Sequence, residues 1–294
     1  MEVTRQPIRF SLSALVLLLM IGMFALLPLQ LTVLSMYIFG YTHYLLAIHY
    51  SKRGIAQAWS KKRSKWLLIS ILPLVFIPYL NESLIVPSLV IYFGIHHVMS
   101  EVYFDAKNHS KQLRTTHWWA LIGSYFAITG HHVPWVANLS SIGWIVNIVA
   151  TLAFLYVWRK EGTLAFKTMV YTCPWIIFGP AVALIGEYIY LDWRFLINWH
   201  FFFWLFIPYL RSGMFNRSQI RTYWKQNILL IALFSFLFFI SLPTGNFDVI
   251  GWEPVGMKIL TKFFLAWSFL HISWSFIISG GNPNWLKSWI ASGR

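Results

Sequence analysis

Apolar stretches of about 20 residues recur along the whole chain, and they restrict its fold more than any other feature. A helix of that length crosses about 30 Å of hydrocarbon, since each residue adds about 1.5 Å. Of the residues, 58% are hydrophobic and 11% are charged, which excludes a soluble globular domain. The sequence therefore predicts an all-α, polytopic integral membrane bundle that forms a single transmembrane domain over residues 1–294.

We expect about ten transmembrane helices, with eight as a lower bound, each roughly 16 to 23 residues long. The first stretch exceeds the core of a signal peptide and is followed at once by a second, so it is predicted to be an uncleaved helix. The third is short. The predicted spans are 10–29, 31–50, 66–80, 84–104, 118–136, 139–158, 168–190, 194–210, 226–242 and 258–279.

The basic residues follow the predicted membrane topology. With the N-terminus in the cytoplasm, 20 of the 23 basic residues fall on the cytoplasmic side, and only Arg194, Lys258 and Lys262 lie at outer ends. We therefore expect a multi-pass protein of the cell (inner) membrane with both termini cytoplasmic. The net charge of +14 is explained by this bias and indicates no nucleic-acid partner. The longest connections between spans, 51–65, 211–225 and 243–257, are expected to be ordinary loops or short interfacial helices.

Four histidines, His43, His96, His200 and His271, lie in four different spans that all run from outside to inside. Each is about 12–17 Å from the cytoplasmic end of its helix. Ionisable residues at this depth are costly and are read first as functional. Four imidazoles at one level suggest a shared iron, copper or zinc ion rather than a hard cation. Hydrogen bonds between helices, and haem held by opposed histidines, remain open alternatives.

Other ionisable residues lie near this level as well. His97 lies about 100° around the helix from His96, so at most one of the two faces a given centre. Glu101, four residues after His97, is a candidate catalytic residue that orients a ligand histidine or acts at the cytoplasmic mouth. The single Cys173 supplies neither a disulfide nor a thiolate site. Interface positions are expected for His49, His109 and His117. His131 and His132 are expected to form a wetted pair near the outer end of the span 118–136, with an outer-leaflet role as the alternative.

The segments around these histidines resemble a known family. Residues 95–101 (IHHVMSE), with a Lys-containing loop and a further His after them, are similar to a motif of the Brp/Blh-type β-carotene-cleaving oxygenases. His43 after 39–42 (FGYT), His200 in 198–200 (NWH) and His271 in 269–271 (FLH) match the order of that family's histidines. The chain departs from the family at Ala47, where an acid is expected, and at Trp204, where a further histidine is expected.

The resemblance implies a non-haem iron, Fe(2+), held by His43, His96, His200 and His271, with O2 as co-substrate and Glu101 in support. The expected function is oxygenation of a long, lipid-soluble substrate, with cleavage of β-carotene to retinal as the best candidate. An aromatic content of 19% suits a polyene tunnel but is also ordinary for membrane helices. The alternatives are a haem-binding or haem-handling membrane protein and a non-enzymatic transporter or assembly factor, for which Pro174 and Pro180 are weak signs.

Overall fold

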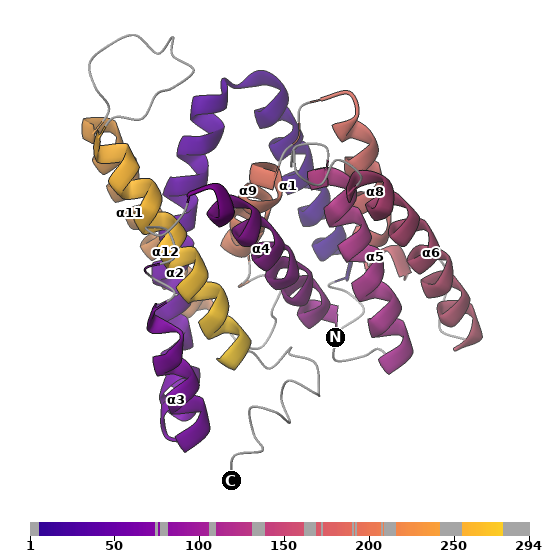
Figure 1. Ribbon diagram of the computed structural model, residues 1–294, viewed down its shortest axis with the longest axis horizontal. Coiled ribbons are helices and arrows are strands. Elements are labelled where there is room, and N and C mark those ends of the chain that lie inside the picture. Colours follow the sequence, from indigo (N-terminus) through magenta and orange to yellow (C-terminus); the bar gives the residue numbers. More distant parts are fainter. Residues whose placement is uncertain are drawn as a thin grey trace. The chain divides into compact units, whose positions relative to one another are not determined.

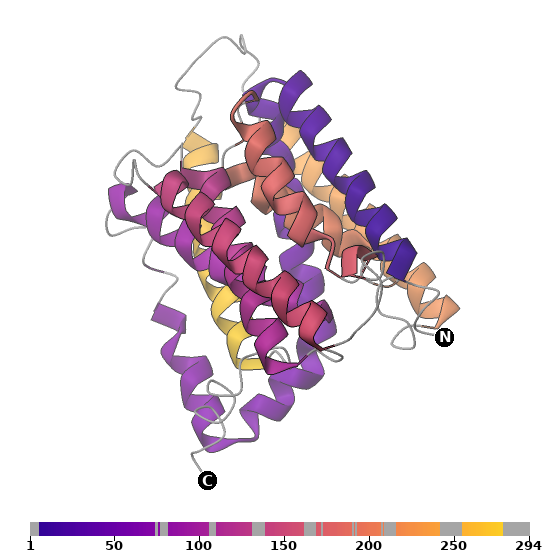
Figure 2. The same ribbon diagram turned by 90° about the vertical axis from the view of Figure 1, so that its right-hand side faces the viewer.

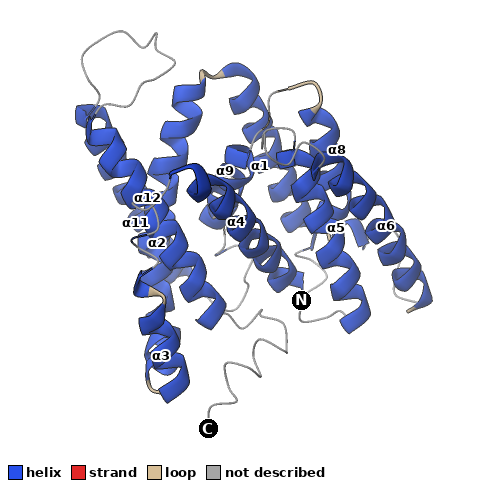
Figure 3. Ribbon diagram, viewed as in Figure 1, coloured by secondary structure: helices blue, strands red, loops and turns tan. Residues whose placement is uncertain are grey.

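The computed structural model of the chain is all-helical. It describes residues 6–73, 76, 82–105, 110–130, 139–161, 169–171, 173–189, 191, 193–206, 208, 216–241 and 255–278, and no strand occurs within these ranges (Figure 3). The predicted all-α class is therefore confirmed. The helices are α1 (Gln6–Leu26), α2 (Leu29–Trp59), α3 (Lys62–Ser70), α4 (Glu82–Asp105), α5 (Lys111–Thr129), α6 (Leu139–Lys160), α8 (Trp175–Gly186), α9 (Trp193–Leu205), α11 (Arg217–Ser241) and α12 (Val255–Ile278).

Several helices extend into segments that were predicted to be connections, and α2 and α11 extend furthest. Helix α2 continues to Trp59, through most of the predicted loop 51–65, and α11 begins at Arg217, inside the predicted loop 211–225. The start of α11 has a reciprocal cap. The backbone N–H of Gln219 donates to Asn216 Oδ1 (2.9 Å), and the backbone N–H of Asn216 donates to Gln219 Oε1 (2.8 Å). This capping box fixes the helix start nine residues before the predicted apolar span, which begins at residue 226.

The third predicted span and the last predicted loop are described only in part. Helix α3 has 9 residues and ends at Ser70, whereas span 66–80 was predicted to reach further. Most of the remainder of that span lies outside the described residues, as does most of the loop 243–257.

Two of the described helices, Gln30–Trp59 and Leu139–Lys160, are long and apolar enough to cross a membrane. Their exposed apolar side chains include Ile145 and Val149 of α6, which are 63% and 62% exposed. The shorter apolar helices are Phe10–Leu26, Trp175–Gly186 and Lys262–Ile278.

The predicted single domain contains two compact units. The first consists of Met1–Val33 and Phe93–Ser212, and the second of Leu34–Tyr92 and Gly213–Arg294. Helices α2 and α4 each contribute residues to both units, because the boundaries fall within them.

In the first unit, α5 and α6 form a tightly packed antiparallel hairpin (Figures 1 and 2). The helices approach closely at Gly123, since a Cβ there would lie 2.3 Å from the backbone N of Asn147. The buried Asn147 amide donates to the Ala120 carbonyl (2.9 Å) and to Ser124 Oγ (2.7 Å). Small residues and a buried amide hydrogen bond are typical of helix pairs packed in membranes.

Substitution of Gly123 by valine is expected to destabilise the protein by about 1–3 kcal/mol, because the added atoms meet the backbone of α6. Gly22→Ala in α1 is the control, since a Cβ there has no atom within 4 Å. Alanine also has the higher helix propensity, so the control should be neutral or slightly stabilising. Thermal unfolding in detergent measures both variants. Equal melting temperatures for the two would contradict the close α5–α6 packing.

In the second unit, aromatic rings hold α2 against α11 and α12. Tyr37 stacks on Phe238 at 5.8 Å between ring centroids and meets Phe264 edge-on at 4.9 Å. Tyr41 stacks on Phe234 at 5.2 Å. The contacts Tyr37–Phe264 and Tyr44–Ser268 show that residue numbers increase in the same direction along both helices. Helices α2 and α12 therefore run parallel. The predicted topology gives the same relation to the second and tenth spans.

Candidate functional site

His43 and His271 form a close pair within the second unit. Their Nε2 atoms are 3.2 Å apart, and their ring centroids are 4.9 Å apart with the planes at 74°. His43 is buried and His271 is partly buried. The hydroxyl oxygens of Tyr44, the residue after His43, and Ser268, about one turn before His271, lie 2.6 Å apart. The parallel packing of α2 and α12 thus fixes the position of both imidazoles.

His96, His97 and His200 form a second cluster, within the first unit. The His200 ring on α9 lies 5.2 Å from the His96 ring and 5.3 Å from the His97 ring, both on α4. All three are buried, and Phe93 contacts His200 at 5.3 Å. The sequence placed His96 and His97 on different faces, and His200 packs against both rings.

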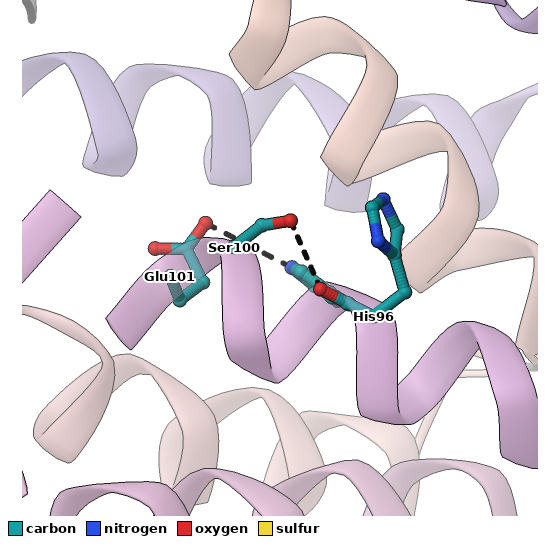
Figure 4. Close-up of polar contacts among 4 residues, drawn as sticks. His96, Ser100 and Glu101 are labelled. Atoms are coloured by element: carbon teal, nitrogen blue, oxygen red, sulfur yellow. Dashed lines mark hydrogen bonds and ion pairs between the residues drawn. The ribbon is translucent and has the colours of Figure 1, made fainter. Parts of the chain in front are cut away.

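Glu101 lies on the His97 side of this cluster. Its Oε1 is 3.9 Å from His97 Nε2, as expected for residues four apart on a helix. Figure 4 shows the His96 ring and the Glu101 carboxylate apart along α4, and the Ser100 hydroxyl donates to the His96 carbonyl (2.9 Å). A buried carboxylate is costly unless a polar group compensates it. The contact at 3.9 Å places the Glu101 carboxylate beside His97.

A small cavity borders the Glu101 contact. It has a volume of about 20 Å³, and His97, Glu101, Ser124, Tyr125 and Trp175 contribute to its lining. This volume is sufficient for one water-sized molecule, which needs about 10–15 Å³ and several polar partners. The centroid of the Trp175 ring is 5.8 Å from that of the His97 ring. The lining could have been anticipated from sequence only in part, because Tyr125 and Ser124 are unremarkable residues in an apolar span.

The remaining histidines fall into two groups. His49 is exposed on α2, which agrees with an interface position, whereas His117 is buried against Phe154 at 5.6 Å between rings. His117 is therefore a core residue of the α5–α6 hairpin, and its position at a membrane interface stays a prediction. The other three, His109, His131 and His132, lie outside the described residues. Cys173 is buried and forms no disulfide.

The two positions that depart from the resembled family lie beside the candidate ligands. Ala47 follows His43 by one turn of α2 and is partly buried. The Trp204 ring lies 5.9 Å from the His200 ring, one turn further along α9. An indole therefore occupies the position at which a further imidazole was expected.

The spacing within each histidine pair fits two adjacent ligands of one metal ion. With metal–nitrogen bonds of about 2.0–2.1 Å and ligand angles of 90–109°, adjacent nitrogens lie about 2.9–3.4 Å apart and ring centroids about 4.5–5.3 Å apart. The His43–His271 distances of 3.2 and 4.9 Å, and the His96–His200 distance of 5.2 Å, lie within these ranges. Among the described residues, however, no three His, Cys, Asp or Glu side chains are grouped to hold a metal.

No protein-family model matches the chain, and no curated protein or solved structure shows significant similarity to it.

Proposed function

We propose that the chain is a multi-pass membrane protein that uses a histidine-bound non-haem iron to oxygenate a long, apolar, bilayer-soluble substrate. The proposed ligands are His43, His96, His200 and His271. One observation carries the proposal: imidazoles in strongly apolar helices occur as close pairs, His43 with His271 and His96 with His200. Isolated structural histidines have no need for such pairing.

The chemistry of the donor set supports iron. Neutral imidazole nitrogens suit iron, copper and zinc, and of these iron is the usual partner of O2 in oxygenases. When bound, the iron would supply the redox chemistry that lets O2 react with a closed-shell substrate. The residues of the chain then hold the ion and keep the site dry. Phe93 and Phe201, both buried beside His200, contribute to that exclusion of water.

A carotenoid is the proposed substrate class. Central cleavage of β-carotene by O2 breaks one carbon–carbon double bond and gives each half one oxygen atom, so the reaction needs no external reductant. The aromatic side chains next to the histidines, such as Trp204 at 5.9 Å from His200, offer flat apolar surfaces to a polyene. Glu101 is proposed to position His97 and the helix around it rather than to touch the substrate.

The haem alternative is less compatible with the spacing inside each pair. Two imidazoles that bind a haem iron from opposite faces hold their nitrogens about 4 Å apart with the porphyrin plane between them. The Nε2 atoms of His43 and His271 are 3.2 Å apart and the rings are in direct contact. This pair, as it stands, leaves no room for a porphyrin.

Expression of the chain in cells that make β-carotene tests the proposal. We expect loss of orange colour, accumulation of retinal, and about one iron per purified chain without a Soret band. The matched control is the same host with the His49→Ala variant, because His49 is exposed on α2. A Soret band would establish the haem alternative. Unchanged pigment with no bound iron, or recovery of the chain outside the membrane fraction, would overturn the proposal.

A further inference from the structure

An apolar groove runs along the outer face of the α5–α6 hairpin in the first unit. Its volume is about 390 Å³, within the range of about 300–1,000 Å³ that ligand sites have. The lining is almost entirely apolar, and the small side chains of Ala150 and Ala153 create the hollow between larger neighbours. Trp119 contributes to the lining and is 49% exposed.

Basic residues cluster at one end of the same hairpin. Lys111 is in the first turn of α5, and Arg159 and Lys160 are in the last turn of α6. Because the helices are antiparallel, these residues lie at the same end, and a hydrogen bond from the Ser110 hydroxyl to the Glu161 carboxylate joins the two helices there. All three basic side chains are exposed. Among the described residues at this end of the hairpin, Glu161 is the acidic one. The net charge of the cluster is positive.

The groove and the basic end are adjacent. Thr116, in the groove lining, is five residues from Lys111, and Ala153 is six residues from Arg159. These separations correspond to about 7–9 Å along the helices. A single molecule that combines an anionic head with an apolar chain can therefore occupy both. Basic pockets between helices on the cytoplasmic side of a membrane are known to bind anionic lipid head groups.

We propose that the α5–α6 hairpin binds an anionic glycerophospholipid, with one acyl chain in the groove and the phosphate at Lys111, Arg159 and Lys160. This inference rests on the membrane location in the proposed function but not on iron or oxygenation. A zwitterionic lipid of the same chain length is a poorer fit, because the positive charge of its choline group would lie beside the basic cluster. A protein partner would need a broader surface than this narrow groove.

Native mass spectrometry of the chain in neutral detergent tests the site with phosphatidylglycerol and phosphatidylcholine of identical acyl chains. We expect phosphatidylglycerol to bind about tenfold tighter or more. The variant Lys111→Gln/Arg159→Gln/Lys160→Gln should abolish this preference. Its matched control, Lys52→Gln/Arg53→Gln/Lys61→Gln, removes the same charge from exposed positions in the second unit and should retain it. Equal losses in both variants would overturn the proposal in favour of unspecific charge attraction.

Two further arms test the groove itself. Val149→Trp fills it from an exposed position and should weaken phosphatidylglycerol binding without unfolding the chain. Glycerol phosphate, which has no acyl chains, should not displace phosphatidylglycerol at concentrations at which the lipid itself saturates the site. Equal competition would assign the cluster to free anions and overturn the lipid proposal. If the chain is found in membranes but shows no lipid preference, the inference fails while the proposed function stands.

Discussion

Replacement of His43 and His271 by alanine is expected to remove iron from the purified protein, with binding weakened by more than about 100-fold. Loss of groups that only orient a ligand already costs 10- to 100-fold in metal affinity, so loss of two ligands should cost more. The Nε2 atoms of this pair, 3.2 Å apart, are spaced as adjacent ligands are. Elemental analysis of iron per chain, on protein purified from membranes, measures the effect.

Two variants separate a metal site from a hydrogen bond between helices. His43→Gln retains a group that can hydrogen-bond to His271 but replaces the imidazole with a weak ligand, so it should lose iron with little change in melting temperature. His49→Ala, on the exposed face of the same helix, should change neither quantity. If His43→Gln kept its iron and His43→Ala lost only about 0.6–2 kcal/mol of stability, the pair would be a structural hydrogen bond.

The sequence predicted the helices well and their ends less well, for a physical reason. Hydropathy detects where the chain is apolar, whereas a helix ends where its backbone hydrogen bonds stop. Residues 51–59 are basic and polar yet continue α2, because nothing in them breaks a helix except one glycine at position 54. At the start of α11, the Asn216–Gln219 capping box is visible in the sequence and gives the correct boundary once it is considered.

For the candidate site, the sequence predicts a depth for each histidine but not its orientation around the helix. Counting residues placed His43, His96, His200 and His271 at similar levels, since rise per residue is nearly constant. Which rings meet depends on helix rotation and packing, which an apolar sequence of nearly uniform hydropathy does not encode. Thus His271 meets His43, and His200 meets both His96 and His97. The burial of His117 in the α5–α6 core escaped prediction for the same reason.

His200→Ala is expected to lose iron as completely as the His43/His271 variant, whereas His97→Ala should retain it. The ring centroids of His97 and His200 are 5.3 Å apart and both side chains are buried, so the two variants create similar cavities in one place. They differ in chemistry, because His97 Nε2 is directed toward Glu101, 3.9 Å away, while His200 is a proposed ligand. Iron content per chain, measured side by side, separates the two roles.

Stability provides the independent readout for His97. Removing it deletes the 3.9 Å contact with the buried Glu101 carboxylate and leaves a cavity, so we expect a loss of about 2–5 kcal/mol. The double variant His97→Ala/Glu101→Gln should recover part of that loss, because a neutral amide costs less to bury than a carboxyl group that can ionise. Recovery of stability with unchanged iron identifies His97 and Glu101 as a positioning pair. Loss of iron in His97→Ala, at the level seen for His200→Ala, would instead make His97 the ligand on α4.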